Sequence, residues 1–191
     1  GAGTDPIGLF PLPFAGASAL QIGDGTLTNY GGASTEQLFQ VTTANSSFTY
    51  YYACVLQDAL HPNNEQPFFQ VEVFDQTGNP IVCGNYLVTA PGNGLVQSTV
   101  VGYTDCWYKP WTPVSINLVS YIGQNIRIKF TAGDCAQGGH FGYAYVEAAC
   151  ASYTINPITI CKGSSGTLTA PGGALSYSWS PGGATTASIS V

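Results

Sequence analysis

The sequence predicts an all-β chain, with one β-sandwich followed by the beginning of a second β domain. Apolar and polar residues alternate in many short runs before Cys150, whereas helical periodicity is hard to find. Gly, Pro, Asn or Asp bounds these runs, as turns between strands require. After Cys150 the composition changes, because Ser, Thr, Gly and Pro dominate. We therefore expect one domain at residues 1–151 and another at residues 152–191.

The clearest strand is Ile126–Phe130, in which three apolar side chains share one face while Arg127 and Lys129 share the other. Similar patterns in the first domain predict strands at Leu38–Thr43, Phe48–Gln57, Phe68–Asp75, Tyr86–Thr89, Leu95–Val101, Val114–Val119 and Phe141–Ala149. Shorter strands are predicted in the second domain at Thr154–Ile160, Gly166–Ala170, Ser176–Ser180 and Ala187–Val191. Trp179 has the character of the buried tryptophan of an immunoglobulin-like sandwich, but such a domain needs about 100 residues and only ~40 remain. We therefore expect a partial domain, which the parent protein continues or another chain completes.

The aromatic strand Phe141–Ala149 has two different faces. Tyr143 and Tyr145 lie on one face, and the small residues Ala144 and Val146 lie on the other. We expect the small face to pack inward against bulky neighbours. In an alternative interpretation, the two tyrosines belong to the core and their hydroxyls form hydrogen bonds at its edge.

The composition excludes several classes of protein. Charged residues make up only 7% of the chain, but twelve Tyr, nine Phe and three Trp argue against disorder. A formal net charge of −6 offers no surface for phosphates, so no nucleic-acid partner is expected. No apolar run approaches the ~20 residues of a membrane span, and the N-terminus lacks the zones of a signal peptide, so no membrane insertion is expected. Six cysteines without a CxxC pair favour disulfides and an extracellular location.

Two sets of segments carry a resemblance to a known family. In the first half they are Phe48–Asp58, His61, Glu65–Phe69 and Val73–Asn79. In the second half they are Trp111-Thr112, Ile116–Leu118, Tyr121–Gln124, Asp134-Cys135 and His140–Tyr145. On these segments, residues 18–150 resemble a module that recurs in large secreted surface proteins of Bacteroidota. The tail resembles PKD-like or immunoglobulin-like repeats through Cys161–Gly163 and Ser176–Thr186.

This resemblance implies a jelly-roll β-sandwich followed by a partial immunoglobulin-like β domain, and it implies no reaction. The parent proteins are typically adhesins, gliding-motility surface proteins or exported enzymes that use the type IX secretion route. Spacing cannot decide how the cysteines pair. We favour disulfides between Cys83 and Cys106 and between Cys135 and Cys150. Cys161 resembles a repeat-domain cysteine with a later partner, and Cys54 is then a buried free thiol.

Two sets of polar residues are candidate metal ligands. Calcium prefers oxygen ligands and suits an acidic extracellular chain, so possible ligands are taken from the turn Gly23–Gly32 and from strands that a jelly-roll brings near it. They are Asp24, Asn29, Glu36 and Glu147. An alternative polar cluster suits a divalent metal such as zinc and consists of Asp58, His61, Glu65, Asp134 and His140. The competing interpretation is that these side chains cap turns and bond backbone amides.

Aromatic side chains near Asp105 are candidates for stacking on sugars. They are Tyr103, Trp107, Tyr108 and Trp111, although Trp111 matches a position of the module that is expected to be packed. The common hydrolase, metalloprotease, nucleotide and thiol motifs are missing, so we expect no catalysis.

The sequence therefore predicts a non-catalytic extracellular module for adhesion or surface structure, whose ligand is a cell surface, a polysaccharide or the chain itself. The alternatives are a subunit of an extracellular fibre that is completed by a neighbouring chain, and a carbohydrate-binding accessory domain of an exported enzyme.

Overall fold

The computed structural model describes residues 3–14, 16–26, 30–81, 84–92, 94–151, 155, 157–170 and 176–191. These residues contain strands and one short 3₁₀ turn, η2 (Val119–Tyr121), and no α-helix. None of them forms a helix with the length and apolar character needed to cross a membrane. The all-β prediction is therefore confirmed.

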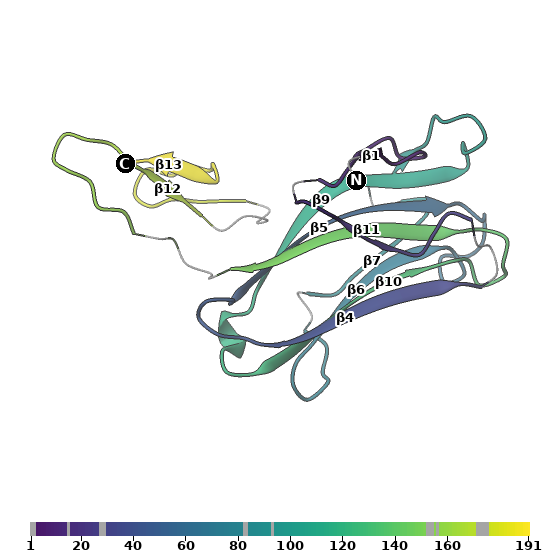
Figure 1. Ribbon diagram of the computed structural model, residues 1–191, viewed down its shortest axis with the longest axis horizontal. Coiled ribbons are helices and arrows are strands. Elements are labelled where there is room, and N and C mark those ends of the chain that lie inside the picture. The colour runs from purple at the N-terminus through teal and green to yellow at the C-terminus, as the bar shows by residue number, and fades with distance from the viewer. Residues whose placement is uncertain are drawn as a thin grey trace.

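Two antiparallel sheets form the sandwich (Figure 1). The four-stranded sheet has the order β4 (Gly32–Gln40), β10 (Asn125–Gly133), β6 (Phe68–Phe74) and β7 (Tyr86–Thr89). The five-stranded sheet has the order β3 (Leu20–Ile22), β11 (Gly142–Ala151), β5 (Ser47–Gln57), β9 (Cys106–Asn117) and β8 (Val96–Gln97). Small two-stranded sheets join β1 (Gly3–Thr4) to β2 (Pro11–Leu12) and β12 (Thr167–Thr169) to β13 (Ser188–Ser190).

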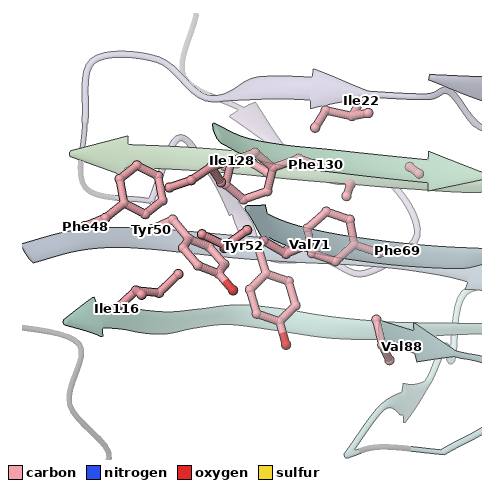
Figure 2. Close-up of a cluster of buried hydrophobic side chains, with 14 of the residues drawn as sticks. Ile22, Phe48, Tyr50, Tyr52, Phe69, Val71, Val88, Ile116, Ile128 and Phe130 are labelled. Atoms are coloured by element: carbon pink, nitrogen blue, oxygen red, sulfur yellow. The ribbon is translucent and has the colours of Figure 1, made fainter. Parts of the chain in front are cut away.

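The inner core lies between the two sheets, and large aromatic side chains fill much of it (Figure 2). Tyr52 of β5 stacks on Phe69 of β6, with ring centroids 5.0 Å apart. Tyr50 of β5 meets Phe130 of β10 edge to face at 5.2 Å. These contacts join the sheets because alternate side chains of each strand point inward. Cys54 is a free thiol buried in this core, as predicted, and burial raises the pKa of this thiol to about 12.

The outer cluster lies on the other face of the five-stranded sheet, under an N-terminal strap formed by residues 3–14 (Figure 1). Ile7 and Phe10 of the strap pack against the sheet there. The buried residues beneath them are Ala53, Val55, Cys106, Phe141, Tyr143 and Tyr145. The sheet thus has apolar side chains on both faces, which explains why strand β5 is apolar at nearly every position.

The faces of β11 follow the sequence prediction. Ala144 and Val146 belong to the inner core, while Tyr143 and Tyr145 belong to the outer cluster. The tyrosine hydroxyls also form hydrogen bonds, as the alternative interpretation expected. Both donate to Oδ2 of the buried Asp5, at 2.9 and 3.1 Å.

Several strand predictions were wrong in their extent. β4 begins at Gly32 rather than Leu38, and β9 begins at Cys106 rather than Val114. Proline and bulky aromatic residues obscure the alternation in the first half of β9, and the pairing of β9 with β5 shifts its register near Tyr52. The described residues of the predicted strands Thr154–Ile160 and Ser176–Ser180 form no strand.

The predicted disulfides are absent from the described residues. Cys83 lies outside them, and its expected partner Cys106 is a buried free thiol. Cys135 and Cys150 are also free. Cys135 follows the end of β10 and is bonded to His140, just before β11 begins, whereas Cys150 pairs with Phe48 near the other end of β11. The length of this strand keeps the two sulfurs apart.

Candidate functional site

Five loops meet at one end of the sandwich, which we call the loop end. In their described residues they are 23–26 with 30–31, 58–67, 90–92 with 94–95, 98–105 and 134–141. The strand register places them together, because Gly133 is the partner of both Gly32 and Phe68, and Phe68 also pairs with Thr89. The last residue of β11, Ala151, pairs with Ser47 at the opposite end. The loop end therefore faces away from the linker to the C-terminal hairpin β12–β13 (Figure 1).

Hydrogen bonds between the loops hold this end together. The amide of Asp58 donates to the carbonyl of Asp105 at 2.8 Å, and the amide of Ala136 donates to the carbonyl of Glu65 at 2.9 Å. Gly31 and Asp134 are bonded in both directions, since the Asp134 amide donates to the Gly31 carbonyl and the Gly31 amide donates to the Asp134 carboxylate. Four of the loops, those that contain Gly31, Asp58, Asp105 and Asp134, are thus connected to one another on a β-sheet scaffold, an arrangement typical of binding sites in β-sandwiches.

Apolar side chains stand at the tips of the loops. Val101 is 94% exposed and Leu60 is 89% exposed, and Tyr30 and Tyr103 are also exposed. Leu60 and Tyr30 have φ angles of 53° and 51°, in the left-handed region that side chains other than Gly, Asn and Asp rarely adopt. Strained backbone of this kind tends to occur at functional sites.

The loop end is acidic. Its described residues include Asp24, Asp58, Glu65, Asp105 and Asp134, which are five of the ten acidic residues, and no Lys or Arg. Burial raises the pKa of the Asp134 carboxyl, and the neighbouring Asp24 carboxylate raises it further, against the lowering effect of two backbone N–H donors. This surface therefore favours partners that bring positive charge.

Two of these carboxylates bond within their own loops, which agrees with the turn-capping interpretation. Asp24 accepts from the amide and hydroxyl of Thr26 at 2.7 and 2.8 Å. Asp58 accepts from the Leu60 amide and from the side-chain amide of Gln66, both at 2.9 Å.

Asp134 and Glu65 are bonded within the loop end as well. Asp134 accepts from the amides of Gly31 and Gly142, each at 3.1 Å. Glu65 accepts from the side-chain amide of Gln137.

The structure does not bring the predicted calcium ligands together. Glu36 forms an ion pair with Arg127 on β10, with 3.8 Å between Oε2 and the guanidinium. Glu147 accepts from the backbone amides of Phe14 and Gly16 on the outer face of the sheet. Asp24 lies at the loop end instead, and Asn29 lies outside the described residues. No three His, Cys, Asp or Glu side chains in the described part of the chain are grouped to hold a metal ion.

The two histidines of the alternative polar cluster do meet. The rings of His61 and His140 pack edge to face, with centroids 5.6 Å apart, and Nδ1 of His61 is buried without a hydrogen-bond partner. The sequence interpretation missed Cys135, whose Sγ lies 3.5 Å from Nδ1 of His140 and donates to the Gly138 carbonyl at 3.1 Å. The histidines of this cluster thus contact each other and a thiol, while its carboxylates cap the loops.

Three of the four predicted sugar-stacking aromatics are packed rather than exposed. Trp107 packs against the inner core, and Tyr108 and Trp111 pack against the outer cluster. Nε1 of Trp111 donates to the Pro11 carbonyl of the strap at 2.7 Å, and its ring stacks on Phe14 at 5.6 Å. Tyr103, which is 39% exposed, is available at the loop end.

The loop-tip residues Leu60 and Val101 were not identified from the sequence. Leu60 follows Ala59 and Val101 follows Val100, so the sequence alone does not mark them as exposed, and the only signal was the nearby turn-forming residues Pro62 and Gly102. The chain matches no protein-family model, and a sequence comparison with curated proteins also gives no match.

Proposed function

We propose that the chain is a non-catalytic extracellular module that serves adhesion or surface structure, with the loop end as its contact surface. The observation that carries this proposal is the exposure of apolar tips, above all Leu60 and Val101, on loops that hydrogen bonds tie to their neighbours. Side chains exposed to this extent contribute little to the stability of the fold, and exposed apolar groups on a rigid surface favour contact with a partner.

The position of the loop end supports the same proposal. β11 ends with Ala151, which pairs with Ser47 at the opposite end of the sandwich, so the chain leaves the sandwich away from the loop end. The resemblance of residues 18–150 to modules of Bacteroidota surface proteins agrees with a location outside the cell. We extend the proposal to export by the type IX route and to a parent protein of the adhesin or gliding-motility type.

An experiment on immobilised ligands tests the proposal. The purified chain is coupled to fluorescent microspheres, and their retention is measured on surfaces coated with polysaccharides, with proteins or with inert polymer. We expect retention on at least one polysaccharide or protein surface, without release of soluble product from it. Retention no greater than on the inert polymer would remove the support for adhesion, and release of a product would show an enzyme.

A fibre subunit is a second candidate function, which the free outer edge of β4 favours. This nine-residue strand pairs only with β10 in the described structure, and it contains neither Pro nor Lys to block a further strand. Regular filaments in negative-stain images of the purified chain would support the fibre. For the other alternative, a carbohydrate-binding accessory domain, Tyr103 is the predicted aromatic residue that is exposed at the loop end. Retention of the microspheres on polysaccharide surfaces alone would favour this alternative.

A further inference from the structure

The outer edge of β11 lacks a neighbouring strand over its last five residues. β11 pairs with β5 along its whole length, from Gly142 to Ala151. On its other side it pairs only with β3, and only over Ala144–Val146. No described strand pairs with the outer edge of residues 147–151. An uncovered edge of this kind presents backbone N–H and C=O groups to any strand that can align with it.

Two cavities lie beside this edge, and both are lined by Leu20, Val146, Ala148 and Ala149. The inner cavity has a volume of about 370 Å³ and reaches Phe48, Ile128 and Phe130 of the core. The outer cavity has a volume of about 450 Å³ and reaches Tyr51 and Glu147. Because successive side chains of a strand point to opposite faces, one added strand would fill both cavities.

The chain itself contains a segment that fits this position. In Pro157–Lys162, the two isoleucines Ile158 and Ile160 alternate with small or polar residues, as in a half-buried strand. The segment forms no strand in the structure, and the two isoleucines are 39% and 42% exposed. Pro157 suits the first position of a strand, where no backbone donor is needed.

The charges of the segment and the edge are complementary. Lys162 is the only charged residue after residue 151, and it is exposed. The inner cavity has Glu36 at its rim, and the outer cavity has Glu147. Docking with the isoleucines on the inner face would bring Lys162 toward the rim that carries Glu36, whose carboxylate already pairs with Arg127, in a chain with a net charge of −6.

We propose that residues 157–162 of one copy of the chain add to the outer edge of β11 in a second copy. The added strand is antiparallel, as are the other strand pairs of the molecule. With Ile160 opposite Ala148 and Ile158 opposite Cys150, both isoleucines point into the inner cavity. The new pairing ends before Val146, which is paired with Leu20, so Lys162 lies at the end of β3, where Leu20 and Glu36 line the same cavity. The occupant comes from a second copy because, within one copy, Ile158 and Ile160 pack beside Gly166 at the start of the C-terminal hairpin, and β11 pairs only with β3 and β5 among the described strands. This exchange is independent of the loop end and of its proposed partners.

Sedimentation velocity of the full chain over a wide concentration range tests this proposal. We expect association into dimers or longer assemblies, because each copy has both a donor segment and an acceptor edge. Ile160→Asp removes the donor and Ala148→Asp blocks the acceptor, so each variant alone is expected to stay monomeric, and their mixture is expected to form heterodimers. Ile122→Asp is the matched control, since Ile122 is 43% exposed in a turn outside the segment and outside the linings of both cavities.

A labelling measurement keeps the test decisive if Ala148→Asp fails to fold. The exposed thiol of Cys150 lines the inner cavity, so its alkylation, followed by mass spectrometry, is expected to slow as the chain associates. A chain that stays monomeric at every concentration would overturn the proposal. Equal weakening of association by Ile160→Asp and Ile122→Asp would also overturn it. Protection of Cys150 that does not depend on concentration would overturn it as well, because such protection would place the segment on β11 of its own copy.

Discussion

The buried carboxylate of Asp5 anchors the N-terminal strap to the sandwich. It accepts four hydrogen bonds, from the amides of Ile7 and Gly8 at 3.0 and 2.6 Å and from the hydroxyls of Tyr143 and Tyr145 at 2.9 and 3.1 Å. Asp5 is completely buried, and both tyrosines are nearly so. We predict that Asp5→Ala strongly destabilises the chain, because the substitution leaves all four donors without an acceptor.

The size of the effect follows from these donors. Each buried donor that loses its partner costs about 1–3 kcal/mol, and loosening of the strap lets water reach some of the four. We therefore expect Asp5→Ala to lower the free energy of unfolding by about 3–5 kcal/mol, near the lower end of the cost for four unpaired donors. Tyr143→Phe removes one donor together with its need for an acceptor, so its cost is about 1 kcal/mol.

Urea unfolding followed by intrinsic fluorescence measures these differences. The decisive comparison is the cost of Asp5→Ala in two backgrounds, the natural chain and the double variant Tyr143→Phe/Tyr145→Phe. The cost is expected to be smaller in the double variant, because two of the four orphaned donors are then absent. Equal costs in the two backgrounds would show that the tyrosine hydroxyls do not depend on Asp5, and would refute the reasoning.

Three further predictions concern a turn, a close approach and the thiols. Hydrogen bonds from Thr77 and Asn79 hold the pKa of Asp75 below its usual value, so Asp75 stabilises the fold at neutral pH and this contribution is lost as the pH falls through the folded-state pKa. The stability difference between the natural chain and Asp75→Ala, measured by thermal unfolding, should therefore shrink in acid; a difference that grows in acid would contradict it. A Cβ at residue 142 would lie 2.6 Å from the Gly133 carbonyl oxygen, so Gly142→Ala is expected to cost about 1–3 kcal/mol in urea unfolding, and an unchanged midpoint would be a failure of this prediction. Brief iodoacetamide treatment of the monomeric native chain should modify the exposed Cys150 and Cys161. It should leave Cys54 and Cys106 unmodified, because both thiols are buried and burial raises their pKa values to about 12. Rapid modification of Cys54 and Cys106 in the folded chain would count against the packing described.

The sequence was sufficient for strands whose alternation is regular. The strand around Ile126–Phe130 and the two faces of Tyr143 and Ala144 were predicted because strand periodicity is local. The strap was not predicted, since residues 3–14 have no periodicity and are held by distant partners such as Tyr143 and Trp111. Covering by this strap also explains why the outer face of the sheet is apolar.

The candidate site was predictable only in part, because it depends on which loops become neighbours. His61 and His140 were selected for their residue type, and the fold does bring their rings together. The side chains of Glu36 and Glu147 were selected in the same way, but Arg127 and the backbone of the strap bind them instead. The spacing of these residues along the chain predicts neither the contact between the two histidines nor the partners of the two glutamates. The exposure of Leu60 likewise depends on the left-handed backbone of its turn, which no local pattern indicated.

The central claim is that the loop end is the adhesive surface, and retention of microspheres that carry substituted chains tests it most directly. The test variant is Leu60→Ser/Val101→Ser. The control is Leu87→Ser/Ile122→Ser, which removes exposed apolar side chains outside the loop end. On a surface that retains the natural chain, we predict that the test variant loses most of its retention while the control variant keeps it. Both variants are expected to unfold at midpoints close to that of the natural chain. Undiminished retention of a folded test variant would contradict the claim.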